Sequence, residues 1–359
     1  MAVLDAEELV ARLRRDVERS VLRTRNGLRL MTGVGKPVTG ASPRDAVWSA
    51  EKVRLYRYRS EDRRWNTPLL FVHSLVSKTY VFDLAPGNSF VETMLRRGHD
   101  VYLLDWGTPD ELEAANTLET YSDGYIPAAV REVLRTSAAD DVNVFGYCFG
   151  GILSLLYAAG HTDDPVRSLS VMATPIDFSH MGALASVLRD GHVDAEDLLD
   201  STGNVPADVI AQGFRMTDPM SAVTEYVDLW QHMWNDDYLK SYRTVMAWAK
   251  DQIPFPGTAF VQMQNELVRP NALPTGRVPL HGGEVDFADI RVPFNNIIGE
   301  KDTIVPPEAT IPLTPIVGAG DGTETRLRGG HVGLVVGRTA QRHHIPAMAS
   351  WIESRMEAP

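Results

Sequence analysis

The first half of the chain alternates short apolar runs with amphipathic segments. The apolar runs have the length and composition of strands that are buried on both faces of a parallel sheet: PLLFVH (68–73), DVYLLDWG (100–107), VNVFG (142–146) and VRSLSVMAT (166–174). Helical periodicity occupies the intervals between them, in NSFVETMLRRG (88–98), YIPAAVREVLRTSA (125–138) and FGGILSLLYAAG (149–160). This alternation predicts a mostly parallel sheet with helices on both faces.

The pattern differs before and after this region. An amphipathic helix is predicted from about Ala6 to Arg29, and KVRLYRYRS (52–60) alternates like a half-buried strand. From about residue 175 to 290 the chain is rich in Met and Trp, and its pattern predicts helical or irregular structure. The runs FNNIIG (294–299) and TETRL (323–327) then predict two more strands, and IPAMASWIESR (345–355) predicts a terminal helix.

These elements divide the chain into three predicted units. Residues 1–51 form an N-terminal helix and lead-in, residues 52–174 and 291–359 form an α/β core, and residues 175–290 form a mainly helical cap inserted before the last two strands. We expect the cap to lie across the carboxyl ends of the strands, because open α/β sheets bind their ligands there.

Composition narrows the classes of partner. The chain has 35 Lys and Arg against 47 Asp and Glu, a formal net charge of −12, which argues against nucleic acid but leaves room for a small anion at a local cationic rim. No apolar run approaches the roughly 20 residues of a membrane span, and the N-terminus lacks the apolar core of a signal peptide. The single cysteine cannot form an internal disulfide, which fits a cytoplasmic location.

That cysteine stands where a nucleophile is expected. In GYCFGG, Cys148 lies between a predicted buried strand and a predicted helix, flanked by Gly146 and Gly150. Gly-x-Cys-x-Gly in this setting is typical of a nucleophile elbow, a turn so tight that its flanking positions must be small. The turn would also leave the backbone N–H of Phe149 at a helix N-terminus, facing a developing oxyanion. The alternative is a buried cysteine that acts only as a small hydrophobe.

A thiol nucleophile needs a base, and ten histidines compete for the role. His331 follows the last predicted strand in a Gly-rich loop, where the elbow fold carries its base. His73 ends a strand on the same edge of the sheet and is the rival. His99 lies at the opposite edge, whereas His343 and His344 adjoin the terminal helix and are expected to be solvated or capping.

The acid has three candidates at strand ends. Asp302 follows the penultimate strand, Asp177 follows an earlier one and is an acceptable alternative, and Asp105 fits a structural role better. A second oxyanion donor is expected from the backbone after LLFVH. That position is Leu75, with Val76 as its neighbour.

Several segments together resemble polyhydroxyalkanoate synthases. The Cys-containing box GYCFGG is similar to the lipase box of that family, as are FVHSLVSKTYVFDLAPGNSFVETMLRRGHDVYLLDWGTPD (71–110), GEKDTIVPPE (299–308), RGGHVGLVVG (328–337) and WAKDQIPFPG (248–257). The similarity runs from about Lys52 to Arg355 and implies an α/β-hydrolase fold. Carried over to this sequence, it makes Cys148 the nucleophile, Asp302 the carboxylate and His331 the general base.

The resemblance also implies a reaction and partners. The expected substrate is an (R)-3-hydroxyacyl-coenzyme A, with 3-hydroxybutyryl-coenzyme A as the short-chain case, and the product is a polyester at a cytoplasmic granule surface. No metal or cofactor is implied beyond the coenzyme A of the substrate. The chain is as short as the catalytic subunits of two-component synthases, so a second, non-catalytic subunit is expected. We also expect a homodimer through the cap, with the stretch from Thr224 to Trp248 as a lid and dimer face.

Two other functions use the same residues differently. A cysteine hydrolase of this fold, such as a thioesterase, lactone hydrolase or polyester depolymerase, would admit water to the acyl-enzyme. A non-enzymatic granule or scaffold protein would carry a decayed site, which the intact Cys, Asp and His argue against. Polymerisation requires that water be excluded, and the cap aromatics are candidates for that role: Trp230, Trp234, Trp248 and Phe255.

Overall fold

An eight-stranded sheet forms the centre of the computed structural model, which describes residues 6–32, 39–217, 229–280 and 282–356. Its strands lie in the order β1-β2-β4-β3-β5-β6-β11-β12. The bounds are β1 (Arg44–Ala50), β2 (Val53–Tyr58), β3 (Leu69–Val72), β4 (Val101–Asp105), β5 (Val142–Tyr147), β6 (Val166–Met172), β11 (Phe294–Gly299) and β12 (Gly322–Leu327). The first two strands pair antiparallel to their neighbours, and all the remaining pairs are parallel, as the apolar runs predict.

The sequence pattern did not predict strand β1. It pairs with β2 and begins at Arg44, inside the stretch that the sequence pattern assigned to the lead-in. Its sequence, RDAVWSA, is exposed or half-buried at every position because it lies at the edge of the sheet. An edge strand of this kind lacks the continuous apolar run that marks the central strands.

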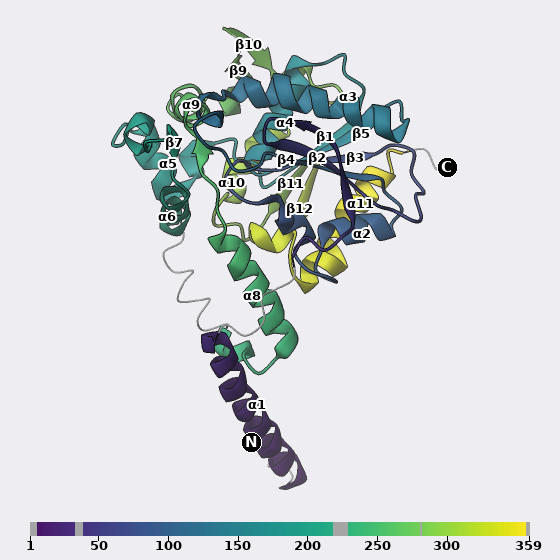
Figure 1. Cartoon of the computed structure of the whole chain (residues 1–359), viewed down its shortest axis with the longest axis vertical. Helices are drawn as coiled ribbons and strands as arrows, with labels where there is room; N and C mark the ends of the chain where they lie inside the picture. The colour runs from purple at the N-terminus through teal and green to yellow at the C-terminus, as the bar shows by residue number, and fades with distance from the viewer. Residues whose placement is uncertain (1–5, 33–38, 218–228, 281, 357–359) are drawn as a thin grey trace.

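Helices cover both faces of the sheet (Figure 1). α3 (Ile126–Ser137) and α4 (Phe149–Gly160) pack on one face, and α2 (Phe90–Arg96) and α11 (Ile345–Glu353) pack on the other. A side-chain cap and a glycine determine where α2 begins and where the chain turns after it. Ser89 caps α2 by accepting a 2.9 Å hydrogen bond from the Glu92 backbone N–H, and Gly98, at a φ of +87°, lets the chain turn into β4.

The segment between β6 and β11 combines helices with short strands. Its helices are α5 (Gly182–Arg189), α6 (Ala207–Thr217), α8 (Asp236–Lys250) and α9 (Gly257–Gln262). Its strands pair as β7 (Asn204–Val205) with β8 (Phe255–Pro256), and β9 (Arg277–Leu280) with β10 (Gly283–Asp286). The short helix α10 (Pro307–Thr310) follows β11. In Figure 1, α5, α6, β7 and α9 gather at one end of the sheet, while α8 points away from it.

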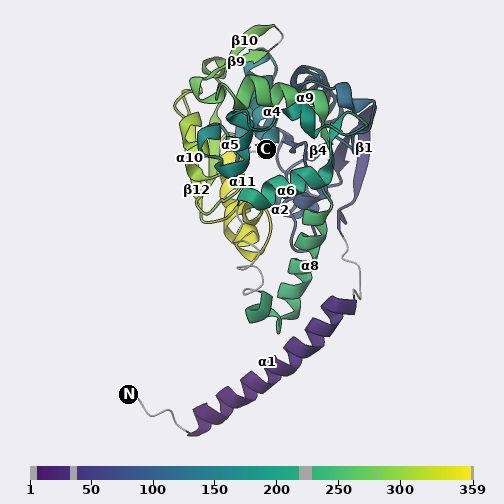
Figure 2. The ribbon, with the colours of Figure 1, turned by 90° about the vertical axis from the view of Figure 1, so that its left-hand side faces the viewer.

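The N-terminal helix α1 (Ala6–Thr32) projects from the rest of the molecule, as Figures 1 and 2 show. It touches the start of α8, where the Arg25 guanidinium pairs with the Asp236 carboxylate at 2.7 Å, and the residues before α8, where the Asn26 amide donates to the Met233 carbonyl at 2.9 Å. Across the described residues, no helix combines the length and the apolar character that a membrane span requires.

Candidate active site

Cys148 occupies a strained turn between β5 and α4. Its φ of 55° and ψ of −124° lie outside the regions that non-glycine residues favour. The turn closes only because its neighbours lack side chains. A Cβ on Gly146 would lie 2.6 Å from the Gly151 Cα, and a Cβ on Gly150 would lie 2.3 Å from the Val72 carbonyl oxygen. The sequence GYCFGG therefore folds as a strand–turn–helix elbow that holds Cys148, a residue 8% exposed, at the carboxyl end of β5.

His331 and Asp302 come together beside this turn. His331 Nδ1 lies 2.8 Å from Asp302 Oδ2, and both side chains are buried. The other carboxylate oxygen, Oδ1, accepts from the backbone N–H groups of Ile304 at 3.0 Å and Val305 at 2.8 Å. These bonds fix the plane of the carboxylate, and the carboxylate in turn fixes the His331 ring with its Nδ1 occupied.

Electrostatics couple His331 to Cys148. Burial by itself lowers the pKa of His331, but the charges of Asp302 and of the Cys148 thiolate outweigh it and raise that pKa to about 10. The hydrogen bond with Asp302 acts in the same direction. The site therefore favours a protonated imidazolium when the sulfur carries a negative charge, which is the state that a cysteine nucleophile needs.

The other candidate histidines have different hydrogen-bond partners, and His73 also stays neutral. His73 is fully buried, and its Nε2 lies 3.0 Å from the Ser77 hydroxyl. Burial lowers the pKa of His73 to about 3, and the charge of His331 acts in the same direction, so His73 stays neutral. His99 pairs with Glu353 at 3.0 Å. His344 is not solvated, because its ring is buried and its Nδ1 lies 3.2 Å from the Gly333 carbonyl oxygen; it is the N-cap residue of α11, but its side chain makes no capping hydrogen bond.

The rival carboxylates have other partners. Asp177 accepts from Asn271 Nδ2 at 2.9 Å and from the Ser179 backbone N–H, and it pairs with His180. Asp105 accepts from the Thr79 hydroxyl and from the Gly107 backbone N–H, each at 3.1 Å. Of the three candidates, Asp302 is the one in contact with His331.

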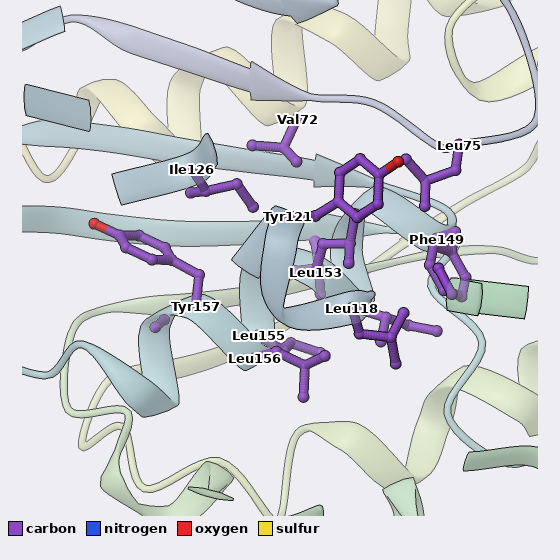
Figure 3. Close-up of a cluster of buried hydrophobic side chains, with 14 of the residues drawn as sticks. Val72, Leu75, Leu118, Tyr121, Ile126, Phe149, Leu153, Leu155, Leu156 and Tyr157 are labelled. Atoms are coloured by element: carbon purple, nitrogen blue, oxygen red, sulfur yellow. The ribbon is translucent and has the colours of Figure 1, made fainter. Parts of the chain in front are cut away.

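The structure gives only indirect support for the two expected oxyanion donors. Phe149 is the first residue of α4, where a backbone N–H has no acceptor within the helix. The Leu75 side chain packs into the buried apolar cluster that also holds Phe149 (Figure 3). The participation of the Phe149 and Leu75 N–H groups stays a prediction.

An apolar cavity of about 150 Å³ opens at the elbow. The wall on the side of the sheet consists of Cys148, Phe149, Ser74 and Val76. The segment between β6 and β11 supplies most of the remaining wall. Representative residues of that wall are Phe178, Leu188, Ile210, Phe214, Phe255 and Phe260. Sequence reasoning did not find these residues, apart from Phe255, nor Ser74, because none belongs to a motif. An apolar wall of this kind offers water few hydrogen-bond partners beside the sulfur.

The other cap aromatics lie away from this cavity. Trp248 is buried in the cluster that holds Cys148, and its Nε1 donates to the Lys78 carbonyl at 2.8 Å. Trp230 is 62% exposed, and Trp234 lies 4.5 Å beneath the Arg19 guanidinium of α1. Of the four aromatics expected to exclude water, Phe255 is the one that lines the cavity. Thr224, where the expected lid and dimer face begins, lies outside the described residues.

A second, more polar groove of about 1050 Å³ lies between α8 and the loop after His331. Val332 and Gly333 line it directly after His331, and Lys240, Arg338 and Arg342 bring three exposed cationic side chains. Its apolar wall includes Val336, which belongs to the same buried cluster as Cys148. No group of three His, Cys, Asp or Glu side chains arranged to bind a metal occurs among the residues that the structure describes.

Comparison with known proteins places the chain in a family. Residues 67–315 match the family model described as alpha/beta hydrolase fold, and residues 6–94 match that of the N-terminus of poly-beta-hydroxybutyrate polymerase (PhaC). The second match reaches well before Lys52, where the motif resemblance began. A putative lipase structure from Sulfolobus solfataricus shares the fold with a TM-score of 0.56 at 14% identity, covering 89% of this chain and 99% of its own.

Curated relatives agree with these models. The poly(3-hydroxyalkanoate) polymerase subunit of Thiocystis violacea is 36% identical over 320 residues, which is 88% of this chain and 90% of the relative. The subunit of the same name from Allochromatium vinosum is 36% identical over 321 residues, with the same coverage of 88% and 90%. The chain therefore belongs to the poly(3-hydroxyalkanoate) polymerase family of acyltransferases and has the α/β-hydrolase fold.

Proposed function

We propose that this chain polymerises (R)-3-hydroxyacyl-coenzyme A into a polyester through a covalent acyl-cysteine, with release of coenzyme A. We expect a short-chain donor, 3-hydroxybutyryl-coenzyme A. The observation that carries the proposal is a strained elbow cysteine that lines an apolar cavity and is electrostatically coupled to a buried His331–Asp302 pair. The family membership of the chain supports the same reaction.

Acylation would begin with a proton transfer. His331 accepts the proton of the Cys148 thiol, and the thiolate attacks the thioester carbonyl to form a tetrahedral intermediate. The backbone N–H groups of Phe149 and Leu75 would hold its oxyanion, and one such donor typically contributes about 3–4 kcal/mol. The intermediate collapses as the coenzyme A sulfur leaves and takes the proton from His331. The acyl group is then a thioester of Cys148.

Elongation explains why the nucleophile is sulfur. A 3-hydroxyl attacks the acyl-cysteine, His331 accepts its proton, and the proton returns to the Cys148 sulfur as the new oxygen ester forms. Transfer from one thioester to another conserves the activation of the acyl group, so formation of the oxygen ester is downhill. A serine would form the oxygen ester one step early. Asp302 orients His331 in both steps and helps to activate the incoming hydroxyl through it.

The leaving coenzyme A gives a reason for the three cationic side chains at the second groove, which Asp237 also lines. Its phosphates carry several negative charges, whereas the protein has a net charge of −12 and repels anions at long range. Lys240, Arg338 and Arg342 would offset that repulsion locally, next to the loop that carries His331. This arrangement supports a coenzyme A thioester as the substrate.

Assembly is part of the same proposal. We expect a homodimer through the segment between β6 and β11, a second non-catalytic subunit, and attachment to polyester granules. Exposed apolar side chains on two elements support an interface: Trp230 before α8, and Val17, Val21 and Leu28 on α1. Sedimentation of the chain alone tests the dimer, since a monomer at all concentrations contradicts it.

Product analysis tests the reaction. The protein is incubated with 3-hydroxybutyryl-coenzyme A, free coenzyme A is measured by chromatography, and the acyl product is separated into polymer and monomeric acid. We expect polymer and free coenzyme A from the native protein and neither from Cys148→Ala. Release of 3-hydroxybutyrate without polymer would instead identify a hydrolase with the same residues.

A further inference from the structure

Ser74 is a buried hydroxyl without a partner in the candidate active site. It follows β3 by two residues and is 2% exposed. Its Oγ has no hydrogen-bond partner anywhere in the part of the chain that the structure describes. The residue lines the apolar cavity together with Cys148 and Phe149. A hydroxyl that is removed from water normally finds a partner, so an unsatisfied one at a reactive centre is available to bind a polar atom of a ligand.

The rest of the cavity offers no second hydroxyl of this kind. Among the described lining residues, Thr217 is the other one with a side-chain oxygen, and its hydroxyl already donates to the Phe214 carbonyl at 2.7 Å. The nearby Ser77 hydroxyl bonds to His73. The described lining therefore presents an incoming acyl group with one uncommitted side-chain hydroxyl, which belongs to Ser74.

A 3-hydroxyacyl group carries two polar groups into this cavity. Its thioester carbonyl oxygen would be matched by the predicted backbone donors, which would leave the 3-hydroxyl against an otherwise apolar wall. We propose that Ser74 hydrogen-bonds the substituent at the 3-position of the acyl group on Cys148, and so selects 3-hydroxyacyl thioesters over unsubstituted ones. This inference rests on the proposed function. A serine hydroxyl can donate and accept, so it also suits the ester oxygen that replaces the 3-hydroxyl in a growing chain.

Single-turnover acylation measures this selection directly. Native protein is mixed with 3-hydroxybutyryl-coenzyme A or with butyryl-coenzyme A, and acylated Cys148 is followed by intact-protein mass spectrometry. We expect the hydroxylated donor to react at least about tenfold faster, because a site with an unmatched polar group disfavours the analogue that lacks its partner. In Ser74→Ala this ratio should fall to about one, mainly through slower reaction of the hydroxylated donor.

Matched variants separate selection from structure. Ser74→Thr keeps a hydroxyl and should retain most of the preference. Thr217→Val removes a hydroxyl that is already satisfied, and it should leave the ratio unchanged. Because Ser74 makes no protein hydrogen bond, Ser74→Ala should unfold at the native temperature or above it. Ser74→Gly provides the same measurement if the alanine variant does not fold.

Two outcomes overturn the inference. Equal slowing of both donors in Ser74→Ala would mean that Ser74 acts on the carbonyl oxygen or on the general structure. An unchanged ratio in Ser74→Ala would mean that the hydroxyl does not read the 3-position. Both results leave the proposed function standing. Failure of the native protein to acylate Cys148 with either donor would contradict the proposed function itself.

Discussion

The chemistry of the candidate site depends on a few side chains with unusual surroundings. Cys148 has a backbone conformation that costs about 1–3 kcal/mol, and the surrounding elbow holds it there. Its partner His331 has a pKa raised to about 10 by the charges of Asp302 and Cys148, against the effect of burial. Substitutions of these side chains should therefore change the reaction rate much more than the stability of the fold.

Cys148→Ser should lose polymerisation although serine fits the turn. An alkoxide is harder to generate than a thiolate, and acyl transfer to oxygen ends the thioester relay, so we expect the rate to fall more than about a hundredfold. Coenzyme A release and polymer yield are measured together with the unfolding temperature, which should be close to native. Polymerisation at a near-native rate would exclude the covalent cysteine mechanism.

Asp302→Asn and Asp177→Asn form a matched pair. Loss of the Asp302 charge should lower the pKa of His331 and leave its ring poorly oriented, with a rate loss of about 10³–10⁴. Asp177 contacts Asn271 and Ser179 instead, so its variant should keep most of the activity and lose some stability. Steady-state rates and thermal unfolding of both variants check this ranking, and the opposite order would move the acid to Asp177.

Side-chain contacts between elements join the C-terminal helix to the end of the sheet where the chain enters β4. The C-terminal helix α11 meets the turn before β4 through Glu353, which pairs with the Arg97 guanidinium and with His99 Nε2. Burial tends to raise the pKa of Glu353, but the hydrogen bonds from His99 and Arg97 lower it to about 2. A carboxyl whose pKa is depressed on folding stabilises the protein above its unfolded pKa, about 4.5.

Glu353→Gln should therefore destabilise the protein in a pH-dependent way. We expect the free energy of unfolding to fall by about 1–3 kcal/mol at pH 7, because a charge-assisted pair is lost and Arg97 stays half-buried. The gap between the two proteins should narrow as the pH falls from about 4.5 towards 2, where the native carboxyl becomes protonated. Urea unfolding across this range measures it, and a gap that widens in acid would refute the pairing.

At the scale of the whole molecule, three cationic side chains at the second groove contrast with the negative net charge of the chain. The chain carries −12 overall, yet Lys240, Arg338 and Arg342 gather at the groove beside the His331 loop. Anion binding there has to overcome repulsion from the remaining surface, so it should depend on these side chains and on salt.

The double change Arg338→Ala and Arg342→Ala should weaken substrate binding selectively. We expect the KM for 3-hydroxybutyryl-coenzyme A to rise about tenfold, which corresponds to about 1.4 kcal/mol, with little change in kcat. The effect should shrink as salt is added, because exposed charges are screened. Arg14→Ala together with Arg15→Ala on the exposed helix α1 removes the same charge and should leave KM unchanged. Equal effects of the two pairs would indicate net charge alone.

The sequence by itself determined the architecture of the core and the chemistry of the elbow. Central parallel strands are recognisable because each must be apolar on both faces, and GYCFGG is recognisable because a tight turn tolerates no side chain at its glycines. Both signals arise between residues that are close in sequence. The same reasoning placed His331 after the last strand, but from residues alone it left Asp177 open beside Asp302.

Only the tertiary structure decided which side chains share the cavity, and it put Asp302 in contact with His331 where the residues alone left Asp177 open. Ser74 has an ordinary sequence context, and it lines the cavity together with Phe214 and Phe255, which are distant in sequence. Likewise Trp230 and Trp234 look like cap core by composition, yet they lie near α1. The sequence pattern did not predict strand β1, because an edge strand needs no apolar run. The physical reason is common to all three: burial is set by long-range packing, whereas local patterns record only the preferences of neighbouring residues.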